Sequence, residues 1–301
     1  MSLRLGVDLG GTKIEIIALD NSGRELLRQR IATPQGDYRA TVSAVAGLVE
    51  QVENKLGQRG TLGIGIPGAE SFASGLIKNA NSTCLIGQPL RRDLQGLLHR
   101  QVRLANDANC FALSEAVDGS AREAEIVFGV ILGTGVGGGI VVNQRVLTGA
   151  NAIAGEWGHN PLPLPTTEDL PLPVCYCGRT GCIETFLSGP GLAADHFRRH
   201  GETLSAGEID ARASAGDSNC ETTLQRYENR LGRALAGVIN ILDPQVIVLG
   251  GGLSKMTRLY RNLPEYCGRH VFSDIFSTHI VPPQHGDSSG VRGAAWLWEF
   301  V

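Results

Sequence analysis

The chain has 301 residues, 42% of them hydrophobic and 19% charged, with a formal net charge of −3. This length allows two domains of ordinary size, and the composition is typical of a soluble globular protein. The near-neutral charge gives no electrostatic basis for binding nucleic acid or an anionic membrane surface, and no apolar run approaches the roughly 18 residues of a membrane helix.

The N-terminal sequence and the distribution of cysteines predict the cellular compartment of the protein. Asp8 interrupts the only apolar run near the N-terminus, so we expect no signal peptide. Three of the seven cysteines are clustered and four are scattered, which fits a reducing cytosol better than a disulfide framework. We therefore expect a cytoplasmic protein with neither nucleic-acid nor membrane partners.

In the first half of the chain, alternating β-rich segments precede a helix. Residues 3–9, 14–19 and 25–30 are predicted to form three antiparallel strands, with tight turns at residues 10–11 and 20–23. Asp37 is predicted to cap a helix that ends near Gly57. Strands over residues 61–66 and 102–105 and a helix over residues 108–117 follow.

The second half begins with a similar pattern. Strands over residues 126–132 and 138–142 are joined by a glycine-rich turn at residues 133–137, a weak repeat of the first hairpin. The repeat predicts a duplicated α/β fold with a nucleotide held between the halves. Later segments predict helices over residues 189–199, 208–215, 221–242, 255–269 and 289–299, with strands over residues 246–249 and near Ile280.

A cluster of metal-binding residue types occupies the middle of the second half. Cys175, Cys177 and Cys182 lie close together, and His159 precedes them by sixteen residues. Three thiolates and one imidazole are the ligand set of a closed tetrahedral zinc site. A buried group of reduced cysteines, or a disulfide, is the alternative interpretation.

Two glutamates flank these candidate ligands. Glu156 lies three residues before His159, and Glu184 lies two residues after Cys182. Folding the ligands around a metal would also fix both carboxylates nearby. This arrangement suggests a site for a polyhydroxylated substrate.

Glycine-rich turns at strand ends suggest phosphate binding. Asp8 precedes the turn formed by Gly10 and Gly11, where backbone amides could bind phosphate oxygens and the carboxylate could bind Mg²⁺. The alternative is a turn that needs glycine only for its geometry. Similar glycine clusters at residues 133–139 and 250–252 favour phosphate binding, although neither a Walker A loop nor a Rossmann fingerprint is present.

Asn106 and Asp107 lie where a short predicted strand meets a helix. Asp107 could cap that helix, which is a common position for aspartate. The carboxyl end of a strand is equally a position for a catalytic base in an α/β fold. The residues alone leave both interpretations open.

Taken together, these motifs resemble those of the ROK family of sugar kinases over nearly the whole chain. They lie at residues 8–13, 106–107, 133–139, 156–159, 175–184 and 250–252. Segments 79–83, 158–162 and 285–295 are most similar to bacterial fructokinases of the manno(fructo)kinase type, with N-acetylglucosamine kinases next.

The resemblance implies an α/β, actin-like (ribonuclease H-like) ATPase fold of two domains that close on a sugar, with a zinc-containing insertion in the second. The expected N-terminal domain covers residues 1–120 together with a C-terminal helix at 289–301, and the expected C-terminal domain covers residues 121–288. In the wider actin-like superfamily the second phosphate hairpin carries an acidic residue, which is missing here, so Asp8 is the main carboxylate candidate for Mg²⁺.

The resemblance also implies roles for individual residues. Asp107 would be the base for the 6-hydroxyl of the sugar, and the other hydroxyls would be held by Asn81, Asn106, Glu156, His159 and Glu184. His159, Cys175, Cys177 and Cys182 would bind structural Zn²⁺. ATP phosphates and Mg²⁺ would be bound by Asp8, Gly10, Gly11, Thr12, Lys13, Gly133, Thr134, Gly135, Val136, Gly137, Gly138, Gly139 and Ile140, with Gly250, Gly251 and Gly252 near the adenosine.

The implied activity is an ATP-dependent hexose 6-kinase, with fructose as the expected substrate. The alternatives are an N-acetylglucosamine kinase or a glucokinase of the same family, or a sugar-responsive transcriptional regulator. Regulators of this family carry an N-terminal winged-helix domain, which is not expected here because the phosphate hairpin begins at Asp8. The family further suggests a homodimer.

Overall fold

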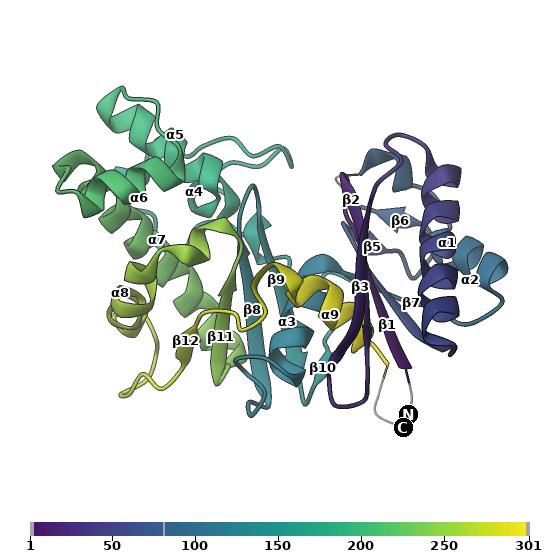
Figure 1. The fold of residues 1–301 in the computed structure, drawn as a ribbon. Helices are drawn as coiled ribbons and strands as arrows, with labels where there is room; N and C mark the ends of the chain where they lie inside the picture. Colours follow the sequence, from purple (N-terminus) through teal and green to yellow (C-terminus); the bar gives the residue numbers. More distant parts are fainter. Residues whose placement is uncertain (1–2, 81, 299–301) are drawn as a thin grey trace. The chain divides into compact units, whose positions relative to one another are not determined.

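The computed structural model describes residues 3–80 and 82–298. Their contacts divide the chain into two compact units (Figure 1). The first unit comprises residues 1–123, 139–154 and 284–301, and the second comprises residues 124–138 and 155–283. These units differ from the expected domains because residues 121–123, 139–154 and 284–288 belong to the first unit rather than the second.

The first unit is built on a five-stranded sheet in the order β3-β2-β1-β4-β7. Its strands are β1 (Leu3–Leu9), β2 (Lys13–Leu19), β3 (Glu25–Ala32), β4 (Gly60–Ile66) and β7 (Arg103–Asn106). β1, β2 and β3 pair in antiparallel fashion, as predicted, whereas β4 and β7 continue parallel to β1. The remaining elements are α1 (Tyr38–Leu56), β5 (Ala69–Glu70), β6 (Ile77–Lys78), a 3₁₀ turn (Thr83–Leu85), α2 (Leu90–Leu98), α3 (Asp107–Val117), β10 (Arg145–Val146), a 3₁₀ turn (Gly286–Ser288) and α9 (Ser289–Ala295).

Successive side chains of each strand point to opposite faces of this sheet, and different helices pack against the two faces. Leu3, Leu5 and Val7 of β1 join the apolar core that also contains buried side chains of α1 and α2. Gly6 and Asp8 lie on the opposite face, against α9 (Figure 1). A Cβ atom at Gly6 would overlap the carbonyl oxygen of Val291, so glycine is required for α9 to approach this closely.

Helix α9 also packs against β4 and α3 through positions that lack side chains. A Cβ atom at Gly63 would overlap the carbonyl oxygen of Ala294, and one at Gly293 would overlap that of Cys110. The helix ends at Ala295, so the predicted helix over residues 289–299 was too long, and Glu299 lies outside the described residues.

The second sheet repeats the topology of the first, in the order β10-β9-β8-β11-β12. β8 (Ile126–Leu132) is followed by β9 (Val136–Val142), whose residues from 139 onward belong to the first unit. β11 (Val246–Gly250) runs parallel to β8, and β12 (His279–Val281) runs parallel to β11. The duplicated α/β fold that the weak internal repeat predicts is therefore confirmed.

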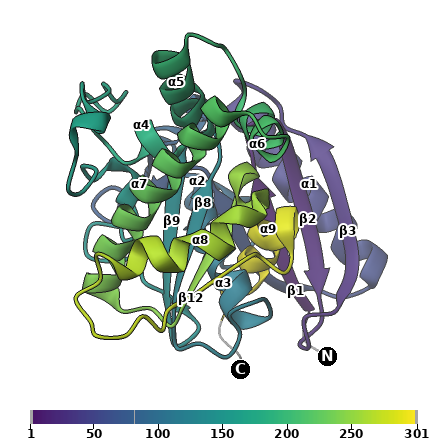
Figure 2. The ribbon, with the colours of Figure 1, turned by 90° about the vertical axis from the view of Figure 1, so that its left-hand side faces the viewer.

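The second unit also contains several helices, two of which lie over the strands of this sheet (Figure 2). The helices are α4 (Glu184–Leu187), α5 (Gly189–His200), α6 (Ala206–Ser214), α7 (Ser218–Leu242) and α8 (Thr257–Gly268), with 3₁₀ turns at Trp157–His159, Thr167–Asp169 and Gly252–Lys255. Figure 2 shows α7 and α8 lying together in front of the strands. A Cβ atom at Gly232 of α7 would overlap the Tyr266 side chain of α8, so the two helices cross in close contact.

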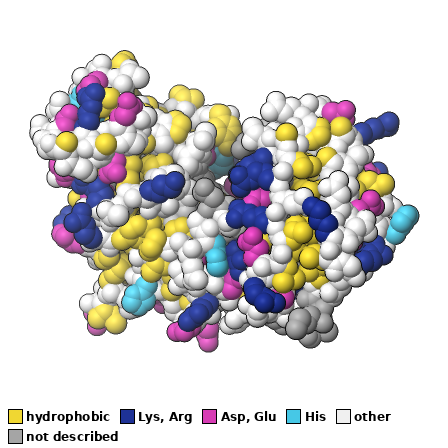
Figure 3. Space-filling model, in the orientation of Figure 1, with side chains coloured by type: hydrophobic (Ala, Val, Ile, Leu, Met, Phe, Trp, Pro, Cys, Tyr) yellow, Lys and Arg dark blue, Asp and Glu magenta, His cyan; other side chains and the backbone are white. Residues whose placement is uncertain are grey.

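Many charged side chains are paired with side chains of opposite sign. In Figure 3, basic and acidic side chains lie interspersed over the face that is viewed. On the outer strand β3, Arg28 and Arg30 form ion pairs with the buried carboxylate of Glu15. Within the described part of the chain, no helix combines the length and the apolar character that crossing a membrane requires.

Candidate functional site

Three polar side chains of the first unit lie at the carboxyl edge of its sheet. Asp8 is near the end of β1, Asn106 ends β7, and Asp107 begins α3. β1 and β7 flank β4 and run parallel to it, so their carboxyl ends lie at the same edge. Ligands of open α/β sheets bind at this edge.

The structure settles which residue caps α3. The Asn106 side chain accepts a hydrogen bond from the Ala108 amide at 2.9 Å and donates one to the Gly68 carbonyl oxygen at 3.1 Å. Asp107 is the first residue of the helix, where the helix dipole stabilises a negative charge. The expected helix start was therefore one residue late, and the N-cap residue is Asn106, although Asp107 Oδ1 also accepts a hydrogen bond from the Ala108 amide at 2.8 Å.

Asp8 has a pKa of about 6, well above its usual range. Burial is the largest cause, and the negative charge of Asp107 adds to it. Helix α9 contributes to the burial, since a Cβ atom at Gly290 would lie 3.8 Å from Asp8 Oδ2. A carboxylate held in this way would gain from a nearby cation, which fits a role with Mg²⁺.

The turn after Asp8 is held from one side by the end of β3. The Gly10 amide donates to the Lys13 carbonyl oxygen at 3.0 Å, and the Thr33 hydroxyl donates to the Gly10 carbonyl oxygen at 2.8 Å. Gly11 and Thr12 are exposed. The turn is thus fixed in shape while its tip remains accessible to a ligand.

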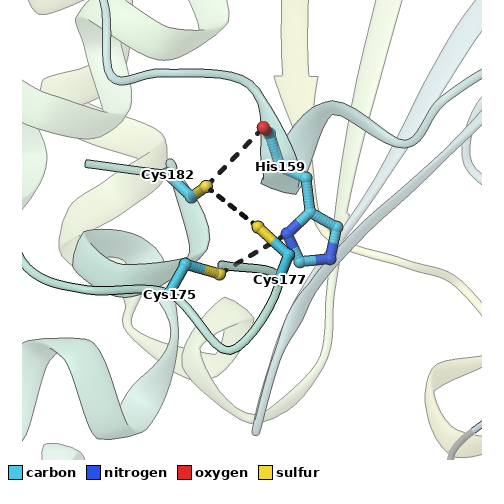
Figure 4. Close-up of side chains that lie close together, drawn as sticks. All are labelled: His159, Cys175, Cys177 and Cys182. Carbon is cyan, nitrogen blue, oxygen red and sulfur yellow. Dashed lines mark hydrogen bonds between the residues drawn. The ribbon is translucent and has the colours of Figure 1, made fainter. Parts of the chain in front are cut away.

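In the second unit, the four predicted metal ligands come together. Their donor atoms all lie within 4.8 Å of one another, and Figure 4 shows the sulfurs and the His159 ring gathered around one region. The Cys177 and Cys182 sulfurs are 3.6 Å apart, as are Cys175 Sγ and His159 Nδ1. Ligands at about 2.3 Å from a tetrahedral zinc ion would be separated by roughly 3.8 Å, so the donor set fits zinc.

The disulfide alternative is excluded because all seven cysteines, which lie among the described residues, are free thiols. Burial raises the pKa of Cys182 to about 12. Bringing a thiol of this kind together with two others favours a bound cation that would convert them to thiolates.

A buried ion-pair network anchors the segment that joins His159 to the cysteines. Asp169, only 1% exposed, pairs with Arg230 at 2.7 Å and Arg233 at 3.0 Å, both on α7. Arg233 also donates to the Pro163 carbonyl oxygen at 3.0 Å. This network holds the loop in the bent path that brings His159 to Cys175. No short motif marks these residues, so they could not be identified from the sequence.

Three predicted sugar-binding side chains lie in or beside the metal cluster. His159 Nδ1 faces the cysteines, whereas Nε2 lies 3.0 Å from the hydroxyl of the exposed Tyr176. The predicted contact between His159 and a sugar would have to share or replace this hydrogen bond. Glu156 is exposed, and Glu184 Oε2 accepts a hydrogen bond from the Val136 amide at 2.9 Å.

The glycine-rich turns of the second unit lie close to one another. Gly251 has φ +82°, and a Cβ atom there would overlap the carbonyl oxygen of Leu132, at the end of β8. The segment at residues 250–252 thus packs against the strand that leads into Gly133. Gly139 and Ile140, predicted as part of the same phosphate site, belong to the first unit. Asn81, a predicted sugar ligand, lies outside the described residues.

Comparison with known proteins identifies the family. The sequence profile of the ROK family matches residues 4–300, and the chain belongs to this family. N-acetyl-D-glucosamine kinases of Salmonella paratyphi B and Salmonella typhimurium are 42% identical to it over 296 residues, which cover 97% of this chain and 98% of theirs. The predicted resemblance to ROK sugar kinases is confirmed.

Solved structures agree with this assignment. The ROK hexokinase of Thermus thermophilus has a TM-score of 0.87 and 32% identity, covering 98% of this chain and 97% of its own. A ROK family glucokinase of Streptomyces griseus, solved with glucose and AMPPNP, has a TM-score of 0.75 and 27% identity, covering 98% of both chains. The fold is therefore the predicted actin-like ATPase α/β fold.

The metal cluster predicts a stoichiometric zinc ion. Purified protein is expected to contain about one equivalent of zinc per chain by elemental analysis, and Cys177→Ser is expected to lose the metal and to unfold at a lower temperature. Cys84→Ser, which changes a thiol outside the cluster, is the control and should retain both. Less than about half an equivalent of zinc in untreated, fully stable protein would contradict the assignment.

The raised pKa of Asp8 predicts a pH-dependent stability difference. Folding at high pH buries an ionised carboxylate, so this residue lowers stability as the pH rises from about 4 through about 6. Metal-free Asp8→Asn is expected to match the wild type near pH 4 and to exceed its free energy of unfolding by up to about 3 kcal/mol above about pH 7. Urea titrations at both pH values measure this difference, and one that is independent of pH would argue against the raised pKa.

Proposed function

We propose that the chain is an ATP-dependent kinase that phosphorylates the 6-hydroxyl of N-acetyl-D-glucosamine. The observation that carries the proposal is 42% identity, across nearly the full length of both chains, with curated N-acetyl-D-glucosamine kinases. The glucokinase solved with AMPPNP supports ATP as the phosphoryl donor. These relatives favour the N-acetylglucosamine alternative over the fructose that the motifs had suggested.

Asp107 is proposed as the catalytic base. Phosphoryl transfer proceeds through a loose transition state, for which alignment and charge neutralisation matter more than covalent chemistry. A sugar hydroxyl is nevertheless a poor nucleophile, and a base within hydrogen-bond reach typically contributes about 10²–10⁴ in rate. Asp107 begins α3 at the carboxyl edge of the sheet, where ligands of open α/β sheets bind, and this position supports the role.

Sugar hydroxyls are proposed to bind Asn81, Asn106, Glu156, His159 and Glu184. Structural zinc held by His159 and the three cysteines would fix the segment that carries the last three of these residues. Four protein ligands fill a tetrahedral site and leave no open position, so zinc supplies structure rather than Lewis-acid chemistry.

The nucleotide is proposed to bind through the glycine-rich turns. The exposed turn at residues 10–13 and the turn at residues 133–140 would bind the phosphates, and the segment at residues 250–252 would lie near the adenosine. Asp8 would bind Mg²⁺, which neutralises charge on the phosphates, directly or through water. Assembly as a homodimer is part of the same proposal.

An ADP-release assay across a sugar panel tests the substrate assignment. N-acetyl-D-glucosamine is expected to lead in kcat/KM over fructose, mannose and glucose by more than about tenfold, because a site that hydrogen-bonds the acetamido group leaves polar groups unpaired with the other sugars. The same assay without sugar measures background ATP hydrolysis. A lead for fructose would restore the expectation from the motifs and reject N-acetylglucosamine.

Asp107→Asn tests the catalytic base. The variant is expected to fold and to bind sugar with near wild-type affinity, while kcat falls by about 10² or more. Circular dichroism and calorimetric titration with the sugar check folding and binding. If the variant retains more than about a tenth of wild-type kcat, the base lies elsewhere.

A further inference from the structure

Two side chains next to the metal ligands form hydrogen bonds with the first two residues of β9, where the glycine-rich turn after β8 ends. Glu184 Oε2 accepts a hydrogen bond from the Val136 amide at 2.9 Å, and the Trp157 indole donates one to the Gly137 carbonyl oxygen at 2.9 Å. Both partners are backbone groups of the turn that we propose for phosphate binding. The segment that carries the metal ligands is thus bonded directly to the nucleotide turn.

Backbone contacts reinforce this attachment. The Gly189 amide donates to the Gly133 carbonyl oxygen at 2.8 Å. A Cβ atom at Gly158 would overlap the carbonyl oxygen of Val136, and one at Gly138 would lie 2.8 Å from the Gly155 carbonyl oxygen. At Gly158 and Gly138 the two segments therefore approach each other closely through their backbones.

The spacing along the chain links these contacts to the metal cluster. Trp157 lies two residues before His159, and Glu184 lies two residues after Cys182. Displacing either metal ligand would displace the neighbouring contact with the turn.

We propose that the metal cluster positions the phosphate-binding turn of the nucleotide site, with Trp157 and Glu184 as the positioning residues. The turn must hold its amides ready for phosphate oxygens, and these hydrogen bonds fix its backbone before the nucleotide arrives. The identification of nucleotide phosphate as the ligand rests on the proposed kinase function. The contacts that join the metal cluster to the turn do not depend on that function.

The two carboxylate oxygens of Glu184 could also couple the binding of the sugar to the binding of the nucleotide. Oε2 is engaged by the turn, whereas Oε1 accepts no hydrogen bond from any of the described residues. Oε1 remains available for a sugar hydroxyl, so one carboxylate can contact the sugar and fix the nucleotide turn. A shift of Glu184 would then weaken the binding of both substrates.

Amide hydrogen exchange tests the link without any activity measurement. Val136 is expected to exchange at least about tenfold faster in Glu184→Ala and in zinc-stripped protein, because its amide loses its acceptor. Glu184→Gln keeps an acceptor oxygen and should retain protection at Val136. Amides of β1 and β4 in the first unit serve as the internal control for global unfolding.

Unchanged Val136 exchange in Glu184→Ala, with the β1 and β4 amides still protected, would overturn the proposal. If zinc removal unfolds the whole protein, the two Glu184 variants still decide it. These outcomes do not depend on which sugar is phosphorylated, so failure of the proposed function would be recognised separately.

Steady-state kinetics test the role of Trp157 with a matched substitution. Trp157→Phe removes the indole donor but retains an aromatic ring against Phe128, and should raise KM for ATP by roughly two- to tenfold, with less than about a twofold change in KM for the sugar. Trp298→Phe removes a similar indole bond, to the Leu62 carbonyl oxygen, far from the turn in the sequence, and should leave KM for ATP unchanged. Equal effects of the two substitutions on KM for ATP would reject Trp157 as a positioning residue.

Discussion

The first unit depends on the close approach of helix α9 to the sheet and to α3. Gly6, Gly63 and Gly293 leave no room for a side chain at these contacts, so backbone packs directly on backbone. The same approach brings Gly290 against Asp8 and contributes to the burial that raises the pKa of this carboxyl group to about 6. A packing constraint at the end of the chain therefore sets the electrostatics of a residue near its beginning.

In the second unit, four side chains that could bind a metal converge, three thiols and one imidazole. A loop between His159 and Cys175 must return on itself, and the ion pairs of Asp169 with Arg230 and Arg233 hold it to α7. Buried ion pairs contribute little net stability, but breaking one leaves an unpaired charge and is costly. The network thus favours one path for the loop, and Trp157 and Glu184, just outside its two ends, hydrogen-bond to Gly137 and Val136.

Much of the fold could be predicted because local patterns and tertiary packing agree in this chain. Alternating apolar residues predicted β1, the apolar segment before a glycine-rich turn predicted β8, and Asp37 and Gly57 marked the ends of α1. Helix α2 received no assignment, and α9 was predicted too long. The substrate could not be predicted in this way, because the sugars phosphorylated by kinases of this family differ in only a few contacts with the protein. No sequence motif specifies the geometry of those contacts.

By itself, the sequence determined the ligand set of the metal cluster, the glycine-rich turns at strand ends and the family, because spacing along the chain specifies these directly. Tertiary structure alone decided that α3 begins at Asp107 with Asn106 as its N-cap, since capping depends on where the helix begins. It alone decided the pKa of Asp8, which reflects burial, to which a helix far away in the sequence contributes, and the charge of Asp107. It alone joined Trp157 and Glu184 to the turn, because hydrogen bonds between distant segments follow from packing in space and leave no periodic pattern in the sequence.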